Sequence, residues 1–478
     1  MSAVRTTSYL VISGGLLLFF QLLSPCPATG QAAKHLHAGS PQKQSLSAID
    51  KKELTSALKA QDSGNRREAE ASLIDLAHRN SESFDVAEAL GLLYAESGEF
   101  TSAIPLLEKA CTLEGSSALA LANLGAAYLK AGRDSDAVPV LDRSLALDPR
   151  NAQTLTSLGI ALSQTGHPRQ AASAFAKAAV ENPRDPSLLY NWALALFNSG
   201  QTALSAEVLS RVSDKDSSAQ TQSLLGDIEE KQGHYEEAVA HLRAAANLDS
   251  SESNLYALGI EFLRHWTFDA AITIFQFGIE RYPSSSRLLL GLGIARYSMN
   301  DVAVAAPIFS KLLAADPDST LYAELLGHSC SLMADASEGC DQLEGFADRH
   351  PGNATIATYA AASILHRPST SENVTAARRL LDRAIVEQPT LAEPYYQMGL
   401  LEQYQSRWPE SISPLERAIA LKPSLSKAHY HLALAYSHAG ARDKAHEEIA
   451  LQKQYSQQEK DDLNAKFKEV TTFMVTMR

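Results

Sequence analysis

Apolar residues recur along the chain at the spacing of helices rather than of strands. In one representative stretch, Leu90 and Leu93 fall on one helical face, and Ile104 and Leu107 fall on one face of a second helix. Positions three or four residues apart lie on the same side of an α-helix, so the pattern predicts two amphipathic helices. A short polar break at residues 97–99 separates them and predicts a tight turn between the helices.

The same pattern returns about every 34 residues. The stretch from Glu88 to Glu114 aligns without a gap with the stretch from Ala122 to Asp148. A small residue late in the first helix marks each unit, and it occurs at Ala57, Gly91, Gly125, Gly159, Ala193, Gly226, Gly259, Gly293, Gly327, Ala361, Gly399 and Ala433. A fixed period of this length indicates a stack of similar supersecondary units.

Two further positions explain how such units would pack. A second small residue normally follows twelve positions after the first, as at Ala103 and Ala137, and small residues at both places let the paired helices approach closely. A proline often ends the second helix, because proline cannot continue a helix. These prolines are Pro149, Pro183, Pro283, Pro317, Pro351, Pro389 and Pro423. Each pair leaves an apolar face that only its neighbours can cover, so stacking builds one continuous core.

This spaced pattern resembles the tetratricopeptide repeat family, in about twelve units between Leu54 and Leu451. The resemblance implies an all-α fold, a right-handed α-solenoid of stacked helix-turn-helix repeats. It also implies a concave groove lined by the first helix of each pair, which commonly binds an extended peptide or a helix of a partner protein.

The repeats and their flanks predict five segments. They are a signal peptide at residues 1–30, a flexible leader at 31–46, an N-terminal repeat array at 47–350, a C-terminal array at 351–451 and a capping helix at 452–478. The division between the arrays rests on residues 335–375, where Gly339 replaces the usual alanine and four extra residues enter the next unit. We expect a soft joint there, since glycine weakens a helix by about 1 kcal/mol relative to alanine.

The N-terminal segment predicts export. An apolar run from Leu10 to Leu23 follows Arg5, and residues 28–30 place small side chains just before the predicted cut. A membrane-spanning helix needs roughly 20 apolar residues, so this shorter run favours a cleaved signal, with a retained anchor as the alternative. The mature chain holds no other run long enough to be a transmembrane segment. We expect a periplasmic or cell-envelope protein, with a signal and composition typical of bacteria.

Composition and motifs then narrow the function. Lys and Arg number 42 against 55 Asp and Glu, a formal net charge of −13, and this acidic balance argues against general nucleic-acid binding. The sequence contains no glycine-rich phosphate loop, GxSxG, HExxH or CxxC motif, and the repeats leave no room for an inserted catalytic domain. We therefore expect no enzyme activity, no catalytic residue, no metal and no cofactor.

The resemblance also assigns candidate groove residues. It places groove side chains about three residues before the first small residue and one, four and five residues after it. The candidates are Tyr190, Phe197, Tyr256, Arg264, Tyr297, Tyr396, Tyr404 and Tyr430, together with Arg287, which lies six residues before Gly293. Such an aromatic, moderately polar groove suits an extended chain, either peptide or glycan. Tyrosines at two of these offsets also serve helix packing in the family, so a packing role stays open.

Two cysteines are candidates for a disulfide. Cys330 falls late in the first helix of the ninth unit and Cys340 in its second helix. Antiparallel packing could bring them together, and an exported protein permits a disulfide. Two buried, unbonded thiols are the alternative. Cys111 has no evident partner.

These observations predict a non-enzymatic, exported scaffold that binds a partner protein or peptide in its concave groove. One alternative is an accessory subunit of a polysaccharide synthesis or export machine, with glycan in the groove. Another is a periplasmic chaperone that binds unfolded exported chains.

Overall fold

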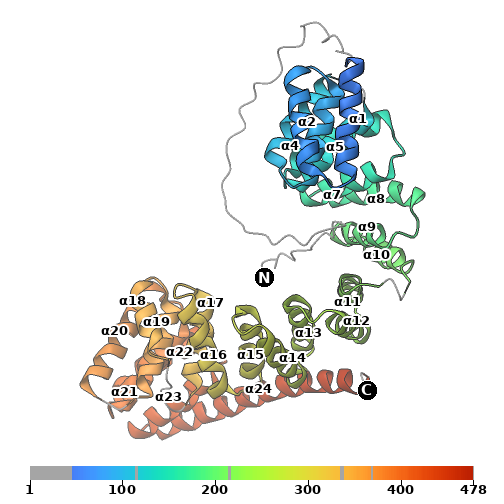
Figure 1. Ribbon diagram of the computed structural model, residues 1–478. Coiled ribbons are helices and arrows are strands. Elements are labelled where there is room, and N and C mark those ends of the chain that lie inside the picture. Colours follow the sequence, from blue (N-terminus) through green and yellow to red (C-terminus); the bar gives the residue numbers. More distant parts are fainter. Residues whose placement is uncertain (1–45, 114–116, 214–216, 334–338, 368–369, 477–478) are drawn as a thin grey trace. The chain divides into compact units, whose positions relative to one another are not determined.

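The computed structural model describes residues 46–113, 117–213, 217–333, 339–367 and 370–476 (Figure 1). The predicted signal peptide and all but the last residue of the predicted leader lie outside these residues. The described part of the chain forms 24 α-helices and contains no strand. It falls into two compact units, the described residues up to Gly233 (unit 1) and those from His234 onward (unit 2). The division predicted at residue 350 stays a prediction.

Unit 1 is built from α1 to α11, which alternate between first and second helices of a pair. Their bounds are α1 Ala48–Asp62, α2 Arg66–Arg79, α3 Phe84–Glu96, α4 Phe100–Leu113, α5 Ala118–Lys130, α6 Asp134–Leu147, α7 Ala152–Gln164, α8 Pro168–Glu181, α9 Pro186–Asn198, α10 Thr202–Leu209 and α11 Ala219–Gln232. Odd-numbered helices are the first of each pair, as the repeat spacing predicts.

Unit 2 continues the alternation from α12 to α24. The bounds are α12 Tyr235–Leu248, α13 Glu252–Arg264, α14 Phe268–Arg281, α15 Ser286–Ser298, α16 Val302–Ala315, α17 Thr320–Leu332, α18 Gln342–Arg349, α19 Ala354–Leu365, α20 Ser371–Glu387, α21 Ala392–Tyr404, α22 Trp408–Leu421, α23 Ser426–His438 and α24 Arg442–Thr476. Within each unit, consecutive helices pack on one another. The predicted all-α solenoid of helix-turn-helix repeats is confirmed.

The small residue of the first helix is a point of close approach between paired helices. A Cβ atom on Gly159 of α7 would lie 2.5 Å from Cε1 of Phe175 in α8, and Gly259 of α13 stands in the same relation to Phe275 of α14. Both phenylalanine rings are fully buried. Glycine is therefore required because the ring of the second helix occupies the space that a side chain would need.

The turn between paired helices needs a left-handed backbone residue. Glycine usually supplies it, as at Gly200 with φ +84° and Gly440 with φ +79°. Three turns use other residues instead, namely Trp266, Asn300 and Ser406, with φ between 57° and 62°. A left-handed conformation is costly for a residue that carries a Cβ atom, so these turns are strained.

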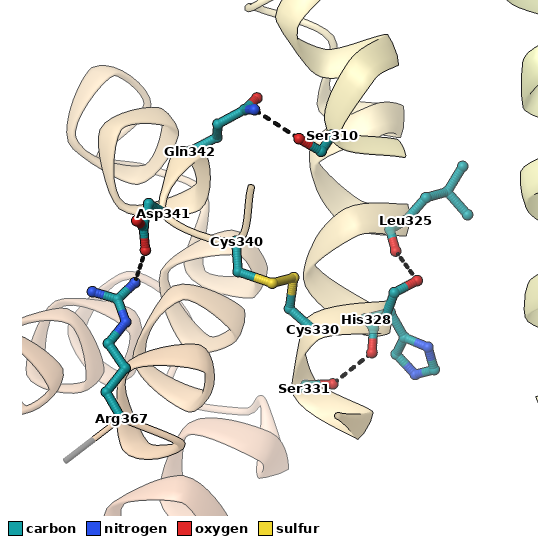
Figure 2. The surroundings of a disulfide bond; sticks show 10 residues. Ser310, Leu325, His328, Cys330, Ser331, Cys340, Asp341, Gln342 and Arg367 are labelled. Atoms are coloured by element: carbon teal, nitrogen blue, oxygen red, sulfur yellow. Dashed lines mark hydrogen bonds and ion pairs between the residues drawn. A yellow bond between two sulfur atoms is a disulfide. The ribbon is translucent and has the colours of Figure 1, made fainter. Parts of the chain in front are cut away.

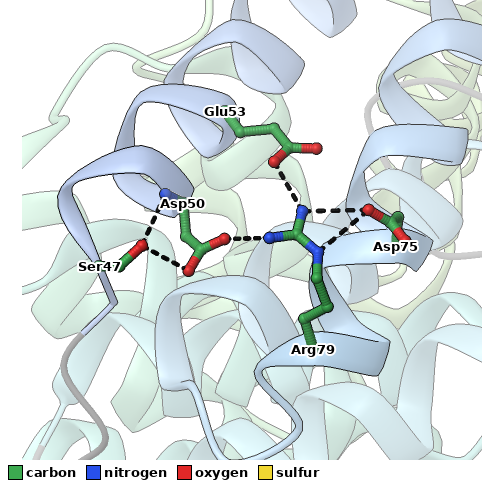
Figure 3. Close-up of polar contacts among 5 residues, drawn as sticks. All are labelled: Ser47, Asp50, Glu53, Asp75 and Arg79. Atoms are coloured by element: carbon green, nitrogen blue, oxygen red, sulfur yellow. Dashed lines mark hydrogen bonds and ion pairs between the residues drawn. The ribbon is translucent and has the colours of Figure 1, made fainter.

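In unit 1, Arg79 at the end of α2 binds the first helix pair together (Figure 3). Its guanidinium contacts Asp50 and lies 2.6 Å from Glu53 Oε2 in α1, and it lies 3.0 Å from Asp75 Oδ2 in α2. Ser47 caps α1 by accepting a hydrogen bond from the Asp50 amide. Leu46, the last residue of the predicted leader, is buried in the adjoining core cluster. The first helix pair is therefore held together by ion pairs as well as by apolar contacts.

In unit 2, a disulfide joins Cys330 of α17 to Cys340, with Cα atoms 6.1 Å apart (Figure 2). The prediction that Cys340 lies within the second helix is wrong, because α18 begins only at Gln342. Gly339, with φ +101°, holds a conformation that a helix cannot contain. Gln342 Nε2 donates to Ser310 Oγ at 2.8 Å and ties this shortened helix to α16.

The last helix, α24, contains the described part of the segment predicted as a capping helix. It is anchored on α23 by His429, whose Nδ1 lies 2.5 Å from Glu448 Oε2 and whose Nε2 lies 2.8 Å from the Pro423 carbonyl oxygen. The Tyr455 ring stacks on the His429 ring. None of the described helices combines the length and the apolar character that crossing a membrane requires.

Replacing Ser406 by glycine should raise the free energy of unfolding of unit 2 by about 1 kcal/mol, because glycine adopts the left-handed turn without strain. Ser406 is exposed at this turn. Urea unfolding followed by circular dichroism measures the change. The matched control is Gly440→Ala, whose Cβ would meet nothing within 4 Å and which should lose a similar amount. A Ser406→Gly variant no more stable than the parent would contradict the strain.

Removing the disulfide with Cys330→Ala and Cys340→Ala together should cost about 2–3 kcal/mol, the loop-closure entropy of a bridge across ten positions. A thiol titration is the independent check. The denatured chain from residue 31 onward should react as one thiol, Cys111, before reduction and as three thiols after it. Three reactive thiols before reduction would show that the bridge does not form.

Candidate functional site

The nine predicted groove residues all lie on first helices, two in unit 1 and seven in unit 2. They differ in exposure. Tyr190 and Tyr396 are buried, Phe197, Tyr256, Arg287 and Tyr297 are half-buried, and Arg264, Tyr404 and Tyr430 are exposed. Only the half-buried and the exposed residues present side chains that a partner can reach.

In unit 1, both candidates lie on α9, and they differ in burial. Tyr190 is 8% exposed, and burial, followed by the charge of Asp227, raises its pKa to about 12. The Phe197 ring is covered from α11 by Lys231, whose Nζ lies 5.2 Å from the ring centroid. The packing role that the sequence left open therefore fits Tyr190.

In unit 2, Arg287 of α15 is fixed by α13. Its Nε donates to Glu252 Oε1 at 2.7 Å and its Nη2 to Ser253 Oγ at 3.0 Å, while the guanidinium lies 5.3 Å from the centroid of the Tyr256 ring. Burial opposes ionisation of Glu252, but the hydrogen bonds from Arg287 and Ser285 prevail and lower its pKa. Arg287 and Glu252 thus neutralise each other on the surface between α13 and α15.

Arg264 has a structural partner that the sequence did not reveal. Glu261, one turn earlier on α13, is 1% exposed, and its carboxylate lies 3.1 Å from Arg264 Nη1 and 3.1 Å from His265 Nε2. A buried carboxylate is costly unless a cation and hydrogen bonds compensate it. Arg264 therefore neutralises Glu261 besides presenting an exposed edge.

Three rings form a row across the first helices α15, α17 and α19. The ring centroids of Tyr297 and His328 are 5.3 Å apart, and those of His328 and Tyr359 are 5.7 Å apart. The Tyr297 phenol also hydrogen-bonds to His328 Nδ1. The Tyr359 ring packs against Gly327. A Cβ atom on residue 327 would lie only 2.6 Å from Cδ2 of this ring. The groove rule could have found His328, one residue after the small residue, but not Tyr359.

Farther along unit 2, Tyr396 of α21 is buried beneath a charged pair. Lys427 of α23 places Nζ 4.6 Å from the Tyr396 ring centroid and 2.8 Å from Glu393 Oε1. Burial and then Glu393 raise the pKa of Tyr396. The Tyr396 ring meets the His431 ring edge-on at 5.8 Å. Tyr396 is thus buried beneath this charged pair, at 6% exposure.

A pocket of about 350 Å³ opens between the first helices α19, α21 and α23. Its lining combines two leucines with five polar or aromatic side chains: Leu365, His366, Gln397, Leu400, Gln403, Tyr404 and His431. It is therefore on the surface that the resemblance assigns to the groove. Of its lining, the sequence had listed only Tyr404 as a site residue.

The polar side chains of this pocket hold one another in fixed orientations. Gln403 Nε2 donates to the His431 backbone oxygen at 2.8 Å, and Gln403 Oε1 lies 2.8 Å from His431 Nδ1. The Tyr404 hydroxyl donates to the Arg367 carbonyl oxygen at 2.7 Å. Side chains with fixed rotamers lose little entropy when a ligand binds, so the pocket is pre-organised for recognition.

A second cavity, of about 530 Å³, lies in unit 1. It opens between the second helices α6 and α8, with side chains of α7 such as Leu158 at its base and Asp142 and Lys177 in its lining. The groove predicted from the repeats belongs to first helices. We therefore take the pocket of unit 2, together with the ring row, as the candidate site. No cluster of three or more potential metal ligands occurs among the described residues.

The family of this helical repeat is identified by its matches to family models. Two models of the tetratricopeptide repeat match, one at residues 94–158 and the other at residues 54–118, 156–220, 190–253 and 256–320. Together the matches span more than half of the 478 residues. The chain belongs to the tetratricopeptide repeat family. A tetratricopeptide repeat protein is in general a protein-interaction scaffold, and this assignment supports protein partners here.

The chain is also similar, at low identity, to several solved structures. A chain of MamA from Desulfovibrio magneticus RS-1 is 20% identical, over 35% of this chain and 94% of that solved chain, with a TM-score of 0.33. PilF of Pseudomonas aeruginosa is 19% identical, over 43% of this chain and 94% of PilF, with a TM-score of 0.37. A chain of the Naa15/Naa10 complex bound to HypK-THB is 14% identical, over 84% and 68% of the two chains, with a TM-score of 0.34. No curated protein sequence matches this tetratricopeptide repeat protein.

The pocket histidine should make stability depend on pH. Burial, and then the charge of Lys427, lowers the pKa of His431 below the ordinary 6.5, and the same two causes lower that of His328. The unfolded chain therefore takes up protons first as pH falls, and the free energy of unfolding should decrease below about pH 6.5. Urea midpoints at about pH 7.5 and 5.5 measure this decrease, and His431→Gln should make it smaller. An unchanged decrease in the variant would contradict the assignment.

Proposed function

We propose that this protein is an exported, non-enzymatic scaffold whose unit 2 groove binds an extended segment of a partner protein. The observation that carries the proposal is the pre-organised pocket between α19, α21 and α23, on the first-helix surface where the family holds its ligands. The ring row of Tyr297, His328 and Tyr359 continues the same kind of surface over α15 and α17.

The pocket suits a side chain of an extended segment better than a free small molecule. Leu365 and Leu400 supply apolar contact, and the ordered polar groups around them would fix the orientation of the bound side chain. A partner segment that crosses several first helices would fill the pocket with one side chain and lay its neighbours along the adjoining helices. Affinity would then come from many modest contacts made by one chain.

The carboxylates nearest the groove are engaged in ion pairs, which favours binding over catalysis. Glu393 pairs with Lys427, and Glu402, which is 7% exposed, lies 2.5 Å from Arg378 Nη2. A general acid or base must be free to exchange a proton with its substrate. These carboxylates instead complete the walls between neighbouring helices.

The disulfide between Cys330 and Cys340 supports the export part of the proposal, because structural disulfides persist in oxidising compartments. The predicted periplasmic or cell-envelope location rests on this bridge and on the signal peptide expected at residues 1–30. Residues 31–478 would then be the chain that meets its partner.

Affinity capture from the native envelope fraction tests the proposal, with residues 31–478 as bait. Leu400→Glu places a charge in the pocket, and Tyr404→Ala removes an exposed ring with little risk to folding. A stoichiometric protein partner should be retained by the parent and reduced at least severalfold by either variant. The matched control is Val386→Glu, which alters a side chain that is 77% exposed on the second helix α20.

Two results would contradict the proposal. Equal capture by the parent and by both pocket variants, with circular dichroism showing all of them folded, would place the partner elsewhere. Retention of glycan without a stoichiometric protein would favour the polysaccharide machine.

A further inference from the structure

The cavity of unit 1 has no part in the proposed groove, because it opens between the second helices α6 and α8. Its volume of about 530 Å³ follows from small side chains: Ala146 of α6 and Ser173 and Ala174 of α8 fill little of the space between the two helices. The leucines of α7 therefore form an apolar floor, and the half-buried Val138 and Leu145 of α6 form an apolar wall. The result is a hole in the surface of unit 1 that suits an apolar side chain.

Two charges of opposite sign lie at the mouth of this hole. Asp142 lines it from α6 and Lys177 lines it from α8, and both side chains are exposed. Among the described residues, neither side chain has an ion-pair or hydrogen-bond partner. They differ in this respect from Arg133, whose Nε lies 2.7 Å from Asp136 Oδ2 at the start of α6. The carboxylate and the ammonium group are therefore both available to a binding partner.

The same surface presents an apolar side chain that is largely uncovered. Val180 is 76% exposed. It follows Lys177 by three positions on α8, so the two side chains lie on the same side of that helix. Removing such a side chain from water is favourable, and a hole with a floor of leucines and a wall of Val138 and Leu145 is the environment that would do so.

These four features make two complementary pairs. The apolar hole matches the apolar Val180, and the carboxylate of Asp142 matches the ammonium group of Lys177. A foreign partner would require only one member of each pair on this surface. A second copy of the chain requires both, because a two-fold axis that places residue i against residue j of the partner also places residue j against residue i. The presence of both members of both pairs therefore favours a second copy over another protein.

We propose that unit 1 forms a two-fold homodimer through α6 and α8. Val180 of each copy enters the hole of the other, and Asp142 of each copy pairs with the partner's Lys177. The inference goes beyond the proposed function and does not depend on it, because it uses only the surface of unit 1. A dimer carries two unit 2 grooves, so a partner with two binding segments would be held at both of them and would dissociate more slowly.

Sedimentation velocity of residues 31–478 over a range of micromolar concentrations tests the dimer. Asp142→Lys alone, or Lys177→Asp alone, places like charges opposite each other at both contacts, and each should raise the dimer dissociation constant at least tenfold. Val180→Glu should do the same, because it brings a charge into an apolar hole. The control Val386→Glu alters an equally exposed side chain of unit 2 and should leave the dimer unchanged.

Recombining the charges gives the decisive comparison. An equimolar mixture of Asp142→Lys and Lys177→Asp restores opposite charges at both contacts of a heterodimer, and the double variant restores them in a homodimer. Both should dimerise within about threefold of the parent, a difference below 1 kcal/mol. Recovery in the mixture also shows that each single variant is folded.

Three results would overturn the homodimer. The first is a parent that stays monomeric, and the second is a parent dimer that both charge variants and Val180→Glu leave intact. The third is a mixture of the two charge variants that stays monomeric. A monomeric parent that captures a protein from the envelope fraction, and loses it in Val180→Glu, would assign the surface to another protein. None of these results bears on the unit 2 groove, which Leu400→Glu and Tyr404→Ala test.

Discussion

The structure depends on how closely the two helices of each pair approach. Where Gly159 meets Phe175 and Gly259 meets Phe275, a Cβ atom would lie only 2.5 Å from the ring. The glycine lets the ring of the second helix pack against the backbone of the first, and the buried ring then forms part of the core. Because this contact recurs at a fixed period, each pair takes nearly the same geometry as the one before.

That repeated contact also creates the groove. The large core residues pack between the two helices of a pair. The side of each first helix that faces away from its second helix is therefore free for other side chains, and because the pairs have nearly equal geometry, these sides line up. The row from Tyr297 to Tyr359 crosses three first helices for this reason, and the pocket around Gln403 and His431 continues from the last of them, α19, over α21 and α23. The candidate site therefore lies on this side of the first helices.

The sequence predicted the fold because its signals are local and periodic. The glycine and alanine markers locate each close approach, and prolines such as Pro149 and Pro183 lie two residues beyond helix ends. Cys340 was misplaced because a helical pattern does not show that Gly339 would take a left-handed backbone.

The site could be predicted only in part. Offsets from the small residue select the first-helix surface, but they cannot tell a buried ring such as Tyr396 from an exposed one such as Tyr404. The contacts of Gln403 with His431 and of Glu261 with Arg264 depend on side-chain rotamers and on which neighbour is buried. A repeat consensus contains neither kind of information.

Site-specific photo-crosslinking in cells measures most directly whether the unit 2 groove holds a partner. A photoreactive amino acid at position 404 would sit beside the pocket, and the same group at position 386 would sit exposed on α20 as a control. We predict one discrete crosslinked protein from position 404 and none from position 386. No crosslinked protein at position 404, or the same products from both positions, would contradict a groove that binds a partner protein.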